Sequence, residues 1–250
     1  MKNFKRNIYR LSGSECDFSG IVEQIPDRSV LKSKNVLILS DPNSTHPDQY
    51  VGDVHLDTIA LSIQNQEMSL GMIPTVMTSY ADFELLTDAQ ISQYAHIWDI
   101  GYDTLITGSA GNKYLTYLSS GGAIFFLGEN SAFIDRDNTI VNIITLAGGG
   151  TVTMSTPNLV QVTADIAPEF LIQNQTPTVV FNAPGVFQNI GSGTMLAQSY
   201  IGVNAAVWKT GSLSSNPTAA IISVLDINFL VGTSVQQDFI DNLSTILNVA

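Results

Sequence analysis

Short apolar runs alternate with polar turns along most of the chain. Five of these runs predict strands, at residues 35–40, 73–78, 94–99, 123–127 and 219–226, and the run at 123–127 is apolar at every position. A strand that is apolar on both faces is typical of a parallel sheet covered by helices on each side. Between the runs, apolar residues recur at helical spacing, most clearly within 139–144 and 235–247. This alternation predicts a three-layer α/β sandwich with a mostly parallel sheet.

Two regions depart from this pattern. Residues 155–218 are rich in Thr, Asn, Pro and Gly and carry short β-branched runs, which predict a β-rich extension at one edge of the sheet. Residues 1–34 precede the first buried strand and hold seven of the ten basic residues of the chain. We therefore expect a basic N-terminal arm at 1–34 and a single α/β domain at 35–250.

Charge separates these two parts. The arm has seven basic and four acidic residues and a formal charge of +3, whereas three basic and 18 acidic residues give the rest of the chain −15. Such an arm can dock on its own domain or on that of a neighbour. The acidic domain would repel phosphate, so we expect no nucleic-acid partner.

The chain is only 13% charged, against about 25% in an average globular domain. Ser, Thr, Asn and Gln replace the missing charges, and a neutral polar surface costs less to desolvate than a charged one. This composition suits surfaces that pack against other molecules. An ordinary secreted domain with neutral loops would have the same composition.

Cysteine content and hydropathy limit the remaining classes. Cys16 is the single cysteine, so no internal disulfide and no cysteine-based metal site is expected. No apolar segment typical of a signal peptide follows the first basic residues, and no apolar run approaches the ~18 to 20 residues that span a bilayer. We expect no membrane insertion. The location stays open, with export to an extracellular or surface assembly by a leaderless route as the favoured interpretation.

Three segments carry a resemblance to a known fold family. They are residues 97–102 (IWDIGY), residues 117–130 (YLSSGGAIFFLGEN) and residues 224–230 (VLDINFL). Over residues 34–250 the chain resembles the flavodoxin-like core of class I glutamine amidotransferases and their ThuA-like relatives. It is more closely similar to a non-catalytic module that recurs in bacterial surface proteins. The resemblance implies a flavodoxin-like sheet.

The amidotransferase chemistry that this resemblance would imply lacks its residues. Members of that family have a cysteine nucleophile at the sharp turn, or elbow, that follows the strand corresponding to residues 123–127. A histidine near a late strand activates this cysteine. Here the elbow position is Glu129, and the three histidines, His46, His55 and His96, all precede it. No Cys–His pair in that order exists, so we predict that this nucleophilic chemistry is absent.

Polar residues follow the carboxyl ends of the predicted strands, where open parallel sheets bind ligands. They are Asp41, Asp99, Glu129, Asn130, Arg136 and Asp226. As a functional set they could bind a cation through oxygen ligands or act as an acid–base pair. In the structural interpretation, which we favour, Asp41 and Asp99 cap turns and helices, and Glu129 pairs with Arg136. We expect no cofactor and no metal site, because the spacing of His46 and His55 matches no known ligand pattern.

The leading functional hypothesis is a non-catalytic structural protein that assembles with copies of itself into a filament, sheath or surface layer. The arm residues Lys2, Lys5, Arg6 and Arg10 would make the assembly contacts together with neutral polar surfaces. One alternative is a hydrolase or sugar-processing enzyme that uses Glu129 and Asp99. Another is a ligand- or carbohydrate-binding surface module that does not self-assemble.

Overall fold

The computed structural model describes residues 33–40, 50–51, 54–101, 104–130, 133–155, 160–230 and 234–249. Residues Lys32–Ala250 form one compact unit. Lys2, Lys5, Arg6 and Arg10 of the predicted arm lie outside the described residues, and so do Asp41 and His46. The proposed division at residue 34 therefore stays a prediction.

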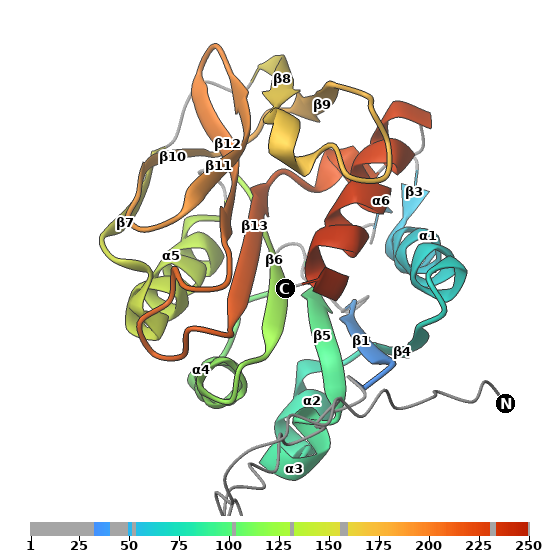
Figure 1. Cartoon of the computed structure of the whole chain (residues 1–250), viewed down its shortest axis with the longest axis vertical. Coiled ribbons are helices and arrows are strands. Elements are labelled where there is room, and N and C mark those ends of the chain that lie inside the picture. Colours follow the sequence, from blue (N-terminus) through green and yellow to red (C-terminus); the bar gives the residue numbers. More distant parts are fainter. Residues whose placement is uncertain are drawn as a thin grey trace, which may run out of the picture. The chain divides into compact units, whose positions relative to one another are not determined.

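A sheet of 11 strands crosses the unit (Figure 1). Its main path runs β4-β1-β5-β6-β13-β12-β11-β8-β9, and β10 pairs with both β12 and β7. The strands are β1 (Asn35–Leu39), β4 (Ile73–Met77), β5 (Tyr94–Asp99), β6 (Ala123–Gly128), β7 (Val152–Ser155), β8 (Gln161–Ile166), β9 (Thr178–Asn182), β10 (Val186–Ile190), β11 (Thr194–Ser199), β12 (Gly202–Trp208) and β13 (Ala220–Leu225). A separate two-stranded ladder pairs β2 (Tyr50–Val51) with β3 (Val54–His55).

The five predicted strands are confirmed, and they form the parallel part of this sheet, with β4 at its partly exposed edge. β1 pairs in parallel with β4 and β5, β5 with β6, and β6 with β13. Every residue of β6 and of β13 is buried. The continuous apolar runs in the sequence correspond to these strands because both of their faces are covered.

Helices lie between the parallel strands in the sequence, as expected. They are α1 (Leu56–Ser69), α2 (Tyr80–Leu85), α3 (Asp88–Ile91), α4 (Gly108–Ser119), α5 (Ile134–Ile144) and α6 (Ser234–Val249). A π-helical turn, η2 (Thr145–Gly149), continues α5 up to the triple glycine, and two 3₁₀ helices, η3 (Pro168–Phe170) and η4 (Ile227–Leu230), follow β8 and β13. Thr107 caps α4 by accepting a hydrogen bond from the Ala110 N–H, and Thr87 forms a capping box on α3.

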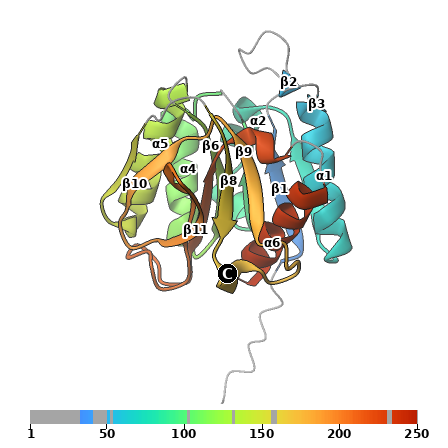
Figure 2. The same ribbon diagram turned by 90° about the horizontal axis from the view of Figure 1, so that it is seen from above.

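Alternate residues of the parallel strands enter two separate apolar clusters. Phe125 and Leu127 of β6 belong to a cluster that includes residues of α1 and α6. Ile124 and Phe126, the neighbours in between, belong to a second cluster with residues of α2, α3, α4 and α5. Figure 2 shows α1 and α6 together on one side of these strands and α4 and α5 on the other. Successive side chains of a strand point to opposite faces, so both faces of the sheet are apolar.

The sheet as a whole is mixed rather than mostly parallel. From β13 onward, β12, β11, β8 and β9 pair with antiparallel neighbours. These strands confirm the β-rich extension at one edge. Because hairpin-forming segments can join a sheet without crossover helices, six further strands join the five of the parallel part and change the balance of the sheet. The fold is a mixed α/β fold with a large, partly parallel sheet.

The outer strand β4 offers little for a further strand to pair with. The Ile73 N–H donates to the carbonyl of Lys34, just before β1. The backbone N–H and C=O groups of residues 73, 75 and 77 therefore face β1, and those of residues 74 and 76 face away from the sheet. Residue 74 is proline, which has no N–H.

Among the described helices, none is long and apolar enough to cross a membrane.

Candidate functional site

The predicted site residues within the described part of the chain lie at the carboxyl ends of three adjacent parallel strands. Asp99 is the last residue of β5, Glu129 and Asn130 follow β6, and Asp226 follows β13. Strand register places Asp99 beside Phe126 and Leu225 beside Gly128. Arg136 lies near the beginning of α5. The structure therefore brings these residues to one edge of the sheet, where they form two separate groups.

The first group is a buried ion pair between Asp99 and Arg136. The Arg136 Nη2 atom lies 2.8 Å from Asp99 Oδ1, and the two side chains are 1% and 0% exposed. Arg136 also donates from Nε to the Leu127 carbonyl at 2.9 Å and from Nη1 to the Thr104 carbonyl at 2.8 Å. Burial acts to lower the pKa of the guanidinium, but the negative charge of Asp99, the Tyr80 hydroxyl and the hydrogen bonds to both together outweigh it, and the pKa is raised. Arg136 is therefore charged at all ordinary pH values.

Two tyrosines complete the coordination of Asp99. The Tyr114 hydroxyl donates to Asp99 Oδ2 at 2.8 Å, and the Tyr80 hydroxyl donates to Oδ1. Burial raises the pKa of both hydroxyls well above the usual value, so both act as neutral donors. The Gly101 N–H also donates to Oδ1 at 3.2 Å, and a Cβ at Gly101 would lie 2.5 Å from the Tyr80 hydroxyl oxygen. This group joins β5, β6, α2, α4 and α5 in one hydrogen-bonded cluster.

The second group contains Glu129 and Asp226, and no basic residue in the described part of the chain makes an ion pair with either of them. Glu129 is 2% exposed, and its Oε1 accepts a hydrogen bond from the Ile227 N–H at 2.6 Å. Its Oε2 accepts from the Asn130 backbone N–H at 3.4 Å and from Nδ2 of the same residue at 3.3 Å. Burial, and then the neighbouring charge of Asp226, raise the pKa of Glu129 well above its usual value.

Asp226 holds the end of β13 against β9. Its Oδ1 accepts from the Asn228 N–H at 2.7 Å and from Asn228 Nδ2 at 2.9 Å, and its Oδ2 accepts from the Asn182 N–H. Asp226 is fully buried, and burial raises its pKa to about 7. Glu129 and Asp226 therefore bind protons more readily than ordinary carboxylates, and their protonation is linked because each charge disfavours the other.

Asp137, which the sequence interpretation did not include, adds a third carboxyl to this group. Its Oδ1 accepts from the Glu129 N–H at 2.9 Å, and the residue is 2% exposed. Burial raises the pKa of Asp137 to about 7, against the lowering effects of this hydrogen bond and of the Arg136 charge. Its position in the first turn of α5 is the sequence signal that could have indicated a backbone-capping role.

The expected pairing of Glu129 with Arg136 is wrong. The Nε–Leu127 hydrogen bond turns the guanidinium toward β5 and Asp99, whereas Glu129 points toward the chain that leaves β13. Asp99 does stabilise the turn after β5 through the Gly101 N–H, as the structural interpretation proposed. Glu129 and Arg136 are close in the sequence, and this proximity favoured the wrong partner. The order of the strands, which brings Asp99 to Arg136, cannot be read from the spacing of two residues.

Another buried cluster was also missed. Glu67 of α1 is fully buried, with its Oε1 3.0 Å from His96 Nε2 and 2.9 Å from Trp98 Nε1. Its Oε2 accepts from Asn248 of α6 at 3.4 Å. The cluster links α1, β5 and α6 and is shielded from solvent. No sequence motif joins residues this far apart, so only the alternation along β5 hinted that His96 and Trp98 share a face.

The described residues hold no group of three or more His, Cys, Asp or Glu side chains arranged to bind a metal ion. The carboxylates at the carboxyl edge accept hydrogen bonds from backbone N–H groups or from Asn, Tyr and Arg side chains, and they are almost fully covered. A general acid, a nucleophile or a metal ligand has to reach its substrate. As arranged, these carboxylates fix the loops that leave β5, β6 and β13.

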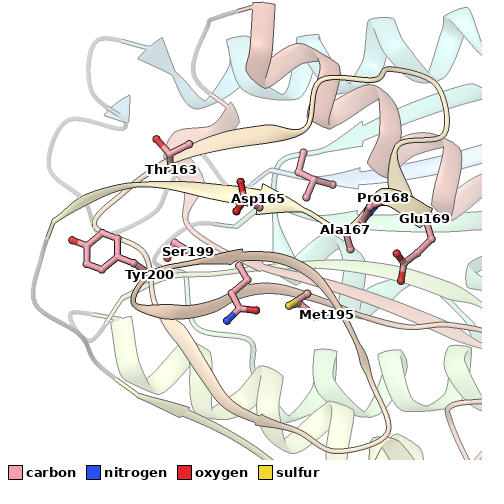
Figure 3. A pocket seen from close by; sticks show the side chains of 10 residues that line it. Thr163, Asp165, Ala167, Pro168, Glu169, Met195, Ser199 and Tyr200 are labelled. Atoms are coloured by element: carbon pink, nitrogen blue, oxygen red, sulfur yellow. The ribbon is translucent and has the colours of Figure 1, made fainter.

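A more open site lies on the β-rich extension. A pocket of about 720 Å³ extends along β8, β11 and the beginning of η3. Figure 3 shows Asp165 and Thr163 on one side of it, Met195 and Ser199 on the other, and Tyr200 and Glu169 toward opposite ends. None of the five described candidate residues of the carboxyl edge lines this pocket.

Comparison with known proteins adds information about the fold. No family model matches the sequence, and no curated protein matches it. The mmIFT52 N-terminal domain is a similar solved structure, with a TM-score of 0.61 and 9% identity over 86% of this chain and 98% of that one. A ThuA-like protein from Parabacteroides merdae matches with a TM-score of 0.53 and 8% identity over 87% of this chain and 91% of that one.

A glutamine amidotransferase from Thermotoga maritima also matches, at a TM-score of 0.49 and 7% identity over 83% of this chain and 80% of that one. At these identities, similarity shows fold and leaves activity open. The ThuA-like neighbour supports the ThuA-like side of the sequence resemblance. The chain is thus similar in fold to ThuA-like proteins.

Proposed function

We propose that this protein is a non-catalytic structural module that self-assembles through its basic N-terminal arm and its neutral polar surfaces. The finer fold assignment belongs to the same proposal, namely a three-layer flavodoxin-like core of the kind that recurs in bacterial surface proteins. The observation that carries the proposal is the structural role of Glu129, the residue at the elbow after β6. Glu129 is 2% exposed and accepts the Ile227 N–H at 2.6 Å, so its side chain holds the fold together.

The same argument applies to the other half of the acid–base pair in the hydrolase alternative. Asp99 is fully buried and already accepts hydrogen bonds from Arg136, Tyr80, Tyr114 and Gly101. A carboxylate that is fully buried cannot reach a substrate group. The hydrolase alternative therefore lacks an accessible pair of groups.

Charge supports self-association over binding of nucleic acid. The arm carries +3 and the rest of the chain −15, so an arm from one copy is attracted to the domain of another. Exposed charges are screened beyond about 10 Å at 0.1 M salt. Apolar residues of the arm, including Phe4, Ile8 and Leu11, would add contacts that salt does not weaken.

The test compares the full chain with a full-length variant whose arm is neutralised, K2Q/K5Q/R6Q/R10Q. Particle size is measured by light scattering after size exclusion and by electron microscopy, between about 0.05 and 0.5 M salt. We expect large ordered particles for the parent, smaller ones at high salt, and monomers for the variant. Particles of the same size for both proteins would contradict a role for the arm, and a monomeric parent would contradict self-assembly.

A further inference from the structure

The pocket on the β-rich extension is shaped and charged to bind an extended basic segment. We call it the β8–β11 groove and define it by Thr163, Asp165, Glu169, Met195, Gln198 and Tyr200. β8 and β11 pair only at Ala197–Ile166 and Gln198–Asp165, so their outer parts leave space between them. The volume of about 720 Å³ accommodates several side chains.

The groove is electrostatically one-sided. Two exposed carboxylates, Asp165 and Glu169, line it, and none of its described lining residues is basic. Tyr200 is 78% exposed at one end, where its ring can receive a cation on its face. These features favour a cationic ligand and disfavour an anionic one.

An apolar pocket adjoins the groove and shares Glu169 with it. This second pocket, of about 300 Å³, is lined by apolar residues of η3, of the following loop and of α6, including Phe170, Ile172, Ile246 and Val249. Ile172 and Val249 are 47% and 71% exposed. Lys209 is the basic residue in its lining. A ligand that spans both pockets therefore needs basic and apolar side chains in close succession.

We propose that the β8–β11 groove and the adjoining apolar pocket bind the N-terminal arm of a neighbouring copy of this chain. The arm begins MKNFKRNIYRL, in which basic residues alternate closely with Phe4, Ile8, Tyr9 and Leu11. Its 31 residues before Lys32 span up to about 100 Å when extended, which is ample to reach another molecule. This inference rests on the proposed function and names the surface that receives the arm.

Binding of the arm is tested directly with a synthetic peptide of residues 1–34, kept reduced because of Cys16. The receptor is the full-length K2Q/K5Q/R6Q/R10Q protein, whose own arm competes less. Fluorescence anisotropy is measured with this receptor and with the same receptor carrying D165N/E169Q. A matched control carries D82N/D88N, which removes two exposed carboxylates from α2 and α3 instead. We expect D165N/E169Q to weaken peptide binding at least tenfold and D82N/D88N to change it less than twofold.

The outcomes separate this inference from the proposed function. The groove would be overturned as the binding site if both pairs of substitutions weakened peptide binding equally, or if neither pair weakened it. This holds whatever the particle size of the parent protein. Binding of a neutral oligosaccharide such as cellohexaose to the groove, without binding of the peptide, would overturn it in favour of a carbohydrate site. Loss of peptide binding with D165N/E169Q alone would support the groove even if the parent formed no large particles, in which case only the assembly proposal would fail.

Discussion

Two groups of buried polar residues lie at the same edge of the sheet, yet they differ in charge balance. Around Asp99, a guanidinium and two tyrosine hydroxyls compensate one carboxylate. Around Glu129, Asp137 and Asp226, three carboxyls are held by backbone and Asn donors, and none of the basic residues that the structure describes makes an ion pair with them. In the first group, a positive charge offsets a negative one. In the second group, burial raises the pKa values of the three carboxyls, which favours their neutral form.

This difference shows two ways of using the crevice of an α/β fold for stability. A compensated ion pair is insensitive to pH over the physiological range but depends on both partners. A group of uncompensated carboxyls needs no cation, but its stability depends on protons. In both cases the side chains at the strand ends hold the loops that follow them.

Removing Arg136 should have the largest effect. Arg136→Met leaves Asp99 buried without its cation and should lower the free energy of unfolding by about 3–5 kcal/mol, measured by urea denaturation at pH 7. In the double variant D99N/R136M the buried charge is absent, so we expect part of the loss to be recovered. A loss of stability below about 1 kcal/mol would contradict the inference that Arg136 offsets the buried charge of Asp99.

The pH dependence of stability should distinguish the second group. The folded pKa values of Asp137 and Asp226 are raised from 3.8 to about 7, so the folded state binds more protons than the unfolded state between these values. Their contribution is fully present below about pH 4 and is lost as the pH rises through about 7. For each of these two groups we expect the free energy of unfolding to fall by about 2–3 kcal/mol between pH 5 and pH 8.

Urea denaturation over this pH range measures that slope. D137N/D226N should flatten it, because an amide does not titrate. Asp238, a half-buried acid on α6 that accepts a hydrogen bond from Thr176, offers a control, and D238N should leave the slope unchanged. An equal slope in the parent and in D137N/D226N would place the titrating groups elsewhere.

The smallest effect is expected at the elbow. In Glu129→Gln the side-chain carbonyl can still accept the Ile227 N–H, so we expect a change below about 1 kcal/mol and no loss of any biological role. Glu129→Ala removes the acceptor and should cost about 1–3 kcal/mol, because the Ile227 N–H stays buried. Turnover of a glycoside, amide or ester that E129Q reduced more than ~100-fold would show catalysis at the elbow.

The fold was predictable to a large extent because both signals that define it are local. Continuous apolar runs identified the strands, and helical spacing with capping residues such as Thr87 identified most of the helices. α2 was not predicted, since six residues carry too little periodicity. The share of antiparallel pairing was underestimated, because the sequence of 155–218 shows strands but not how many join the same sheet.

For the candidate site, the sequence by itself determined which polar residues follow the buried strands, and it excluded a Cys–His pair at the elbow. Only the tertiary structure decided the partners. Strand order placed Arg136 beside Asp99 instead of Glu129, brought Tyr80 and Tyr114 to the same carboxylate, and left Glu129 with Asp226. The physical reason is range, because burial and backbone pattern act between near neighbours, whereas ion pairs and pKa shifts depend on distances that only the folded sheet fixes.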